Sequence, residues 1–105
     1  MDFSTLDYDG RVFVVRSNSD NGEVGDGTVF RYRQVGDRLT GTYAGGAVEE
    51  GHLVGTVHAD GSLSFLYQHR TTEGELRAGR CTSVPDCDAE GRLVLRERWQ
   101  WFTGD

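Results

Sequence analysis

The end of the chain places one acidic side chain in an apolar setting. In the stretch RLVLRERWQWFTGD, alternate residues from Leu93 to Trp101 are leucine or tryptophan, except for Glu97. Alternate residues of a β-strand share one face of the sheet, so this carboxyl group is predicted to lie among hydrophobic side chains. A carboxyl group in such a place either pairs with a structural cation or acts as a ligand contact or an acid/base.

The preceding segment supplies a candidate cation for this carboxyl group. If PDCDAEG forms the loop between the last two strands, matching apolar residues across the ladder sets Arg80 opposite Glu97 and turns both inward. The same register turns Leu76 and Val84 inward and Cys81 outward. Two interpretations stay open: the ion pair satisfies itself inside the fold, or one of its members contacts a ligand.

These side chains must be positioned by strands, because the sequence shows alternation and frequent turn signals but no helical period. The chain has 15 glycines, several of them in Asn-Gly or Asp-Gly pairs, and one proline. The predicted strands are 11–16, 28–35, 38–47, 53–58, 62–69, 75–84 and 92–102. An eighth strand would come from FSTLDYDG, residues 3–10, or from a split of the long third strand. The 105 residues are expected to form a single domain, 1–105.

Each short turn also predicts which residues face each other across the sheet. The pairs predicted from turns at 36–37, 59–61 and 49–51, respectively, are Tyr32 with Gly41, Phe65 with Gly55, and Tyr43 with Val57. Large rings opposite glycines favour a sharply bent sheet. The predicted fold class is therefore all-β: an antiparallel up-and-down meander curled into a small barrel of seven or eight strands. The alternatives are an open, strongly curled sheet and a sheet paired with a second copy.

The predicted inner face is mostly aromatic, with a few polar groups among the rings. Small barrels often hold one small ligand in such a setting. The predicted ligand-binding residues are Tyr32, Tyr43, Tyr67, His69, Arg80, Glu97 and Trp99. The long polar segment SNSDNGEVGDG is interpreted as a plain turn, with a lid that uses Asn18, Asn21 and Glu23 as the alternative.

Three functions are compatible with this face. The first is binding of a small hydrophobic or amphipathic molecule, which a screen with anionic aromatic or acyl compounds would test. The second is an enzyme that uses His69 or Glu97 as an acid/base. The third is a structural or oligomeric module, such as a homodimer that pairs edge strands.

Composition excludes several other classes of protein. The net charge is −6 and no lysine is present, so nucleic acid and anionic membranes are not expected as partners. No apolar run is long enough to span a membrane and no signal peptide is recognisable, so a cytoplasmic protein is expected. The two cysteines have C-x5-C spacing and the three histidines are scattered, so neither a metal site nor a cofactor is expected.

Four stretches of the chain resemble a family of small bacterial proteins: SNSDNGEVGDGTVFRYRQ, GTYAGGAVEEGHLVG, YQHRTTEGELRAGRC and ERWQWFTGD. Members of that family are often labelled N-acetylglutamate synthase, which implies acyl transfer from acetyl-CoA as an alternative activity. An acyltransferase of the usual type has an α/β domain with a glycine-rich loop at a helix N-terminus, whereas this sequence predicts no helix. Separately, RLTGTYAGGAVEEGHLVGTV is similar to the strands of avidin and lipocalin barrels, and this resemblance implies a meander that binds small hydrophobic or amphipathic ligands.

Overall fold

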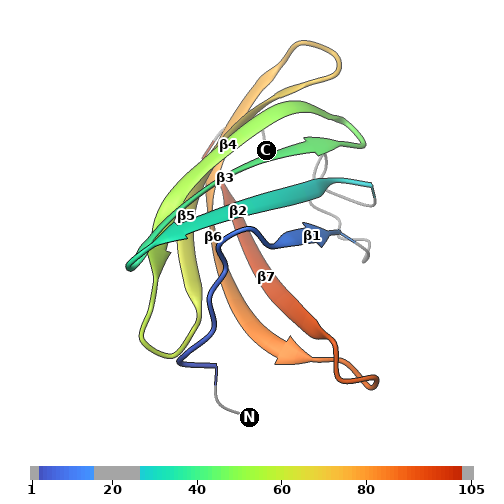
Figure 1. The fold of residues 1–105 in the computed structure, drawn as a ribbon. Coiled ribbons are helices and arrows are strands. Elements are labelled where there is room, and N and C mark those ends of the chain that lie inside the picture. The colour runs from blue at the N-terminus through green and yellow to red at the C-terminus, as the bar shows by residue number, and fades with distance from the viewer. Residues whose placement is uncertain (1–2, 16–26, 103–105) are drawn as a thin grey trace.

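The computed structural model describes residues 3–15 and 27–102, which form one antiparallel sheet of seven strands in chain order. The strands are β1 (Val12–Val14), β2 (Val29–Val35), β3 (Arg38–Gly45), β4 (Val48–Val57), β5 (Leu63–Thr71), β6 (Leu76–Cys87) and β7 (Leu93–Trp101). The sheet curls into a half-barrel, which confirms the predicted all-β meander (Figure 1). In the described ranges no backbone pairing joins β7 to β1, and no helix is long and apolar enough to cross a membrane.

The hydrophobic core lies on one face of this sheet. Alternate residues of β2 show why: Phe30 and Tyr32 are buried, while Arg31 and Arg33 are exposed. The same alternation in the other strands directs rings and leucines to the inside of the curl. The buried hydrophobic residues are Tyr8, Phe30, Tyr32, Leu39, Tyr43, Val48, Leu53, Leu63, Phe65, Tyr67 and Cys81.

Two of the three predicted strand pairings are confirmed, because Tyr32 pairs with Gly41 and Phe65 pairs with Gly55. The prediction for Tyr43 is wrong: its partner is not Val57.

Tyr43 pairs with Gly51 because the turn between β3 and β4 comes earlier than residues 49–51. Gly46 and Ala47 form that turn, and the positive φ of Gly46 (62°) and of Gly45 before it (114°) suits glycine. The partner of Tyr43 moves from residue 57 to residue 51, an even number of residues, so the side chains of β3 keep their predicted face. The ring of Tyr43 now lies over the bare backbone of Gly51, where a Cβ atom would run into it.

We expect Gly51→Ala to destabilise the protein, because the new methyl group would occupy the place of the buried Tyr43 ring. Overpacking of this kind typically costs about 1–3 kcal/mol. Chemical denaturation of the variant and the wild type would measure the difference. Thr42→Ala on the exposed face of β3 is the matched control, and it should change stability by less than about 0.5 kcal/mol. A Gly51→Ala protein as stable as this control would contradict the expectation.

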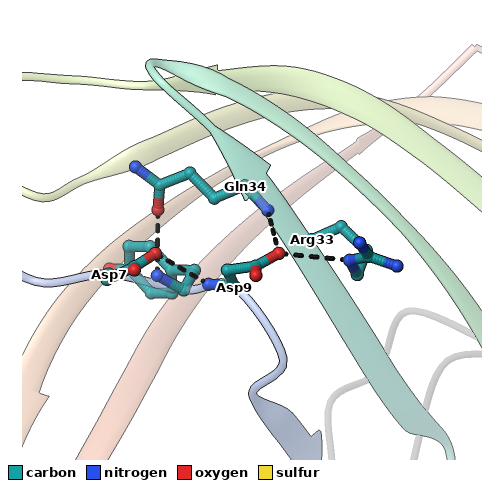
Figure 2. A network of polar contacts seen from close by, with 5 residues as sticks. Asp7, Asp9, Arg33 and Gln34 are labelled. Atoms are coloured by element: carbon teal, nitrogen blue, oxygen red, sulfur yellow. Dashed lines mark hydrogen bonds and ion pairs between the residues drawn. The ribbon is translucent and has the colours of Figure 1, made fainter.

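The segment before β1 is bound to β2 by polar contacts (Figure 2). The backbone N–H of Tyr8 donates to Oε1 of Gln34, at 2.9 Å. The carboxylate of Asp9 accepts from the backbone N–H of Gln34, at 3.0 Å, and from Nε of Arg33, at 3.1 Å. These side-chain contacts take the place of a strand ladder, so the eighth strand predicted in residues 3–10 is not formed.

The same segment carries Tyr8 into the core. Its ring is fully buried, 6.2 Å from the ring of Tyr32 and 6.4 Å from that of Phe13. Its hydroxyl donates to the carbonyl oxygen of Gly61 in the turn between β4 and β5, at 2.6 Å. Tyr8 therefore joins β1, β2 and this turn across the inside of the half-barrel.

The predicted register between the last two strands is wrong, and the error begins at Pro85. β6 continues through this proline to Cys87, so the loop is shorter than PDCDAEG. Hydrogen bonds from Asp88 to Arg92 and from Phe102 to Ala78 show that even-numbered residues of β6 bond to β7. Pro85 is odd-numbered, so its ring nitrogen points away from β7 and toward the side of β5. The pairing of β5 with β6 ends at Ser83, so no strand there requires the N–H that proline lacks.

This register separates the predicted ion pair. Arg80 lies opposite Gln100 on the exposed face, where its Nε donates to the Gln100 side chain at 3.0 Å. Glu97 lies opposite Ser83 instead. Leu76 and Val84, which were predicted to face inward, are 74% and 51% exposed.

Candidate functional site

Glu97 is bound by two small side chains of β6. The hydroxyl of Ser83 donates a hydrogen bond to Oε2 of Glu97, and the thiol of Cys81 lies 3.7 Å from the same oxygen. Ser83 and Cys81 are buried, whereas Glu97 is half-buried. Within residues 3–15 and 27–102, Glu97 forms no ion pair, so its charge is not neutralised by the described protein.

Burial dominates the titration of this cluster. It raises the pKa of Glu97 to about 7, although the hydrogen bonds from Ser83 and Cys81 favour the charged form and oppose the rise. Burial and then the Glu97 charge raise the pKa of the Cys81 thiol far above its ordinary value. A thiol held protonated in this way is a poor nucleophile. The same two causes raise the pKa of Tyr32, which therefore stays a neutral phenol.

An aromatic wall adjoins the carboxyl group, with Trp99 at its centre. The ring of Trp99 lies edge-on to Tyr67 at 4.9 Å and to Phe65 at 6.1 Å. It also reaches across the curl to Phe30 of β2, with the ring centres 5.9 Å apart. Trp99 thus connects the last strand with the second strand through side chains, although the two strands share no backbone pairing.

A second polar pair lies further along the inner face. The hydroxyl of Tyr43 and Nδ1 of His69 are 2.8 Å apart, and both residues are buried. His69 also packs edge-on against Trp101, at 5.8 Å. Trp101 follows Glu97 by four residues, which corresponds to roughly 13 Å of extended strand. The His69 pair and the Glu97 cluster are therefore separate groups on one wall.

The inner side chains of β5 and of the edge strand β7 differ in how far they are covered. Those of β5 are buried, from Leu63 to Thr71. Every inward side chain of β7 is half-buried: Leu93, Leu95, Glu97, Trp99 and Trp101. Phe13 of β1 and Val57 of β4 are also half-buried, but β7 is half-buried along its whole inner side. This strip along β7 contains both the carboxyl group and the tryptophans.

The fold and this strip agree with a comparison of the chain with known families. A family model described as avidin-like protein matches residues 6–105. The chain belongs to the avidin-like protein family. No curated protein and no solved structure gives a significant match. The avidin-like match agrees with the resemblance seen in the strands, and the half-barrel meander is the architecture it implies.

The structure of this avidin-like chain places six of the seven predicted binding residues on the inner face. Tyr32, Tyr43, Tyr67 and His69 are buried there, and Glu97 and Trp99 are half-buried on the accessible strip. Arg80 is the exception, because it is exposed on the outer face. The segment that contains Asn18, Asn21 and Glu23 lies outside the described residues, except for Gly27 at its end.

Sequence reasoning missed three residues around the carboxyl group: Tyr8, Cys81 and Ser83. The sequence did contain a signal for the phase of β6 that carries Cys81 and Ser83. β6 places Gly79 opposite Trp101 and Cys81 opposite Trp99, so small residues face the two largest rings. In the described ranges, no group of three or more His, Cys, Asp or Glu side chains is arranged to hold a metal ion.

Proposed function

We propose that this avidin-like protein binds a small amphipathic molecule on the inner face of β7, against Trp99 and beside Glu97. The observation that supports the proposal most directly is the graded burial of the inner face. Side chains of β5 are covered, whereas the apolar and acidic side chains of β7 remain half-buried. Partly exposed aromatic rings beside a few convergent polar groups are typical of small-molecule sites.

Membership of the family supports the same function. The avidin-like family includes proteins that bind small ligands such as biotin, and its fold is a small-molecule-binding barrel. In this chain the hydrogen-bonding groups beside the aromatic wall are Glu97, Ser83 and the hydroxyl of Tyr32. Arg80 does not take part, since its guanidinium is exposed on the opposite face. Arg80 therefore offers no guanidinium to an anionic ligand on the inner face.

Both tryptophans of the chain lie on the proposed surface, so intrinsic fluorescence should report binding directly. A thermal-shift screen of small amphipathic molecules, with biotin included, would identify ligands for titration. We expect Trp99→Ala to weaken the binding of such a ligand at least tenfold, equivalent to about 1.4 kcal/mol, because the ring forms the centre of the wall. Isothermal titration calorimetry would measure the change.

Gln100→Ala is the matched control for this substitution. Its side chain adjoins Trp99 in sequence but lies on the exposed face, where it accepts from Arg80. We expect this variant to bind as the wild type does. Equal losses in both variants, or a screen in which no compound raises the melting temperature or changes the tryptophan emission, would overturn the proposal.

A further inference from the structure

The inner face carries a charge imbalance. Three arginine ion pairs, Arg33–Asp9, Arg70–Glu49 and Arg96–Asp86, have both partners at exposed positions. Glu97 has no such partner among the described residues. A carboxylate that is partly removed from water without a cation is costly, so a positively charged ligand would relieve the cost.

The carboxyl group also has an oxygen available for a ligand. Both hydrogen bonds that Glu97 accepts, from Ser83 and Cys81, go to Oε2. Within the described residues, Oε1 accepts none, and the nearby hydroxyl of Tyr32 also forms no hydrogen bond. An ammonium group has three donors and no acceptor, so it can donate to Oε1 of Glu97 and to the hydroxyl oxygen of Tyr32 at once.

The surroundings of the carboxyl group suit a cation as well. Aromatic faces attract cations through the negative charge density of their π-systems, most strongly in tryptophan. Trp99 follows Glu97 on the same face of β7, and the charge of Glu97 contributes to the raised pKa values of Tyr32 and Tyr8. The site therefore combines a carboxylate with neutral phenols and an indole, and the described residues bring no basic side chain to it.

We infer that the ligand is an organic cation: a primary or secondary ammonium group attached to a flat apolar body. The ammonium group donates to Glu97 and Tyr32, and the apolar body packs against Trp99. This inference rests on the proposed function, because it specifies the charge of the molecule that occupies the same strip.

Binding of such a ligand should release a proton near neutral pH. Among the described residues, the titratable groups that face Glu97 are Cys81 on β6, Tyr32 on β2 and Tyr8 before β1, and their pKa values are all raised above the ordinary range. They stay protonated between pH 5 and 8, whereas Arg96 and Arg98 lie on the exposed face of β7. Glu97 is therefore the group in this cluster that loses a proton when the cation binds. The affinity for the cation should rise with pH until Glu97 is already ionised in the ligand-free protein.

The test compares three probes that share one aromatic body: phenethylamine, 2-phenylethanol and 3-phenylpropionate. At pH 8 we expect the ammonium probe to bind at least tenfold more tightly than the alcohol, and the anion to bind most weakly. Glu97→Gln should remove the preference for the ammonium probe. Glu73→Gln, which makes the same change of charge at an exposed position, should preserve it. Calorimetry at pH 6.5 in two buffers of different ionisation enthalpy should show proton release with the wild type only.

Three outcomes would overturn the inference: equal affinity for the ammonium and alcohol probes, tighter binding of the anion, or an unchanged preference in Glu97→Gln. Circular dichroism of that variant would verify its folding, so that lost binding is not mistaken for lost structure. If the screen finds neutral or anionic ligands that depend on Trp99, the charge inference fails and the proposed function stands. If no molecule of any charge perturbs the tryptophans, both fail.

Discussion

Replacing Glu97 with glutamine should make the ligand-free protein more stable at pH 8, by about 3 kcal/mol at most, with little effect at pH 4. The reason is the cost of a charge that has no cation nearby among the described residues. Glutamine keeps an oxygen that accepts the hydrogen bond from Ser83 and removes the charge. The gain should therefore be greatest where the wild-type carboxyl group is ionised.

The direction follows from the shift in pKa. Folding raises the pKa of Glu97 from 4.5 to about 7, so the folded state favours the protonated form. The associated stability is fully present below the unfolded pKa, is lost as the pH rises through the folded pKa, and changes no further above it. The wild type should consequently lose stability between about pH 4.5 and 7.5.

Urea denaturation at several pH values would measure this difference. The quantity to compare is the free energy of unfolding of the variant minus that of the wild type, because this difference cancels the contributions that the two proteins share. Glu73→Gln serves as the control, because it makes the same substitution at an exposed side chain outside the Glu97 cluster. A flat difference for Glu97→Gln would show that the carboxyl group is not desolvated in the folded state.

Truncating Phe30 to alanine should destabilise the protein by about 3–5 kcal/mol, a large share of the stability of a typical small domain. This ring is 1% exposed. It stacks on Tyr43 at 4.6 Å and meets Trp99 at 5.9 Å, so it joins β2 and β3 to the far end of the sheet. Its loss would leave a cavity at the centre of the core and remove the partner that Trp99 reaches across the curl.

Phe102→Ala provides a matched control, because it makes the same truncation at a ring that is 59% exposed. We expect that variant to lose no more than about 0.5 kcal/mol. Denaturation midpoints of both variants would be followed by tryptophan fluorescence and by circular dichroism. If Phe30→Ala cost no more than Phe102→Ala, the aromatic core would not be the source of the stability of the half-barrel.

The local features of the fold were predictable because they depend on residues close together in the chain. The turn Gly36-Asp37 fixes the pairing of Tyr32 with Gly41, and a one-residue slip there would expose the core face. Alternation alone predicted that Tyr67 and His69 face inward. Even where the turn between β3 and β4 was misplaced, the period of two kept Tyr43 on the correct side.

The environment of Glu97 was not predictable in the same way, because both phases of β6 contain plausible inner residues. One phase carries Leu76 and Val84, and the other carries Cys81 and Ser83. Pairwise matching favours the more apolar phase, whereas the folded sheet must also fit Trp99 and Trp101 within a tight curl. Small side chains opposite those rings satisfy that volume requirement.

The sequence by itself therefore determined the meander, most of the inner face and the presence of a carboxyl group beside tryptophans. Only the tertiary structure decided that this carboxyl group lies next to Ser83 and Cys81 and has no ion pair with Arg80. The physical reason is that strand register within a curled sheet is set by packing across the whole interior, which local turn signals do not specify.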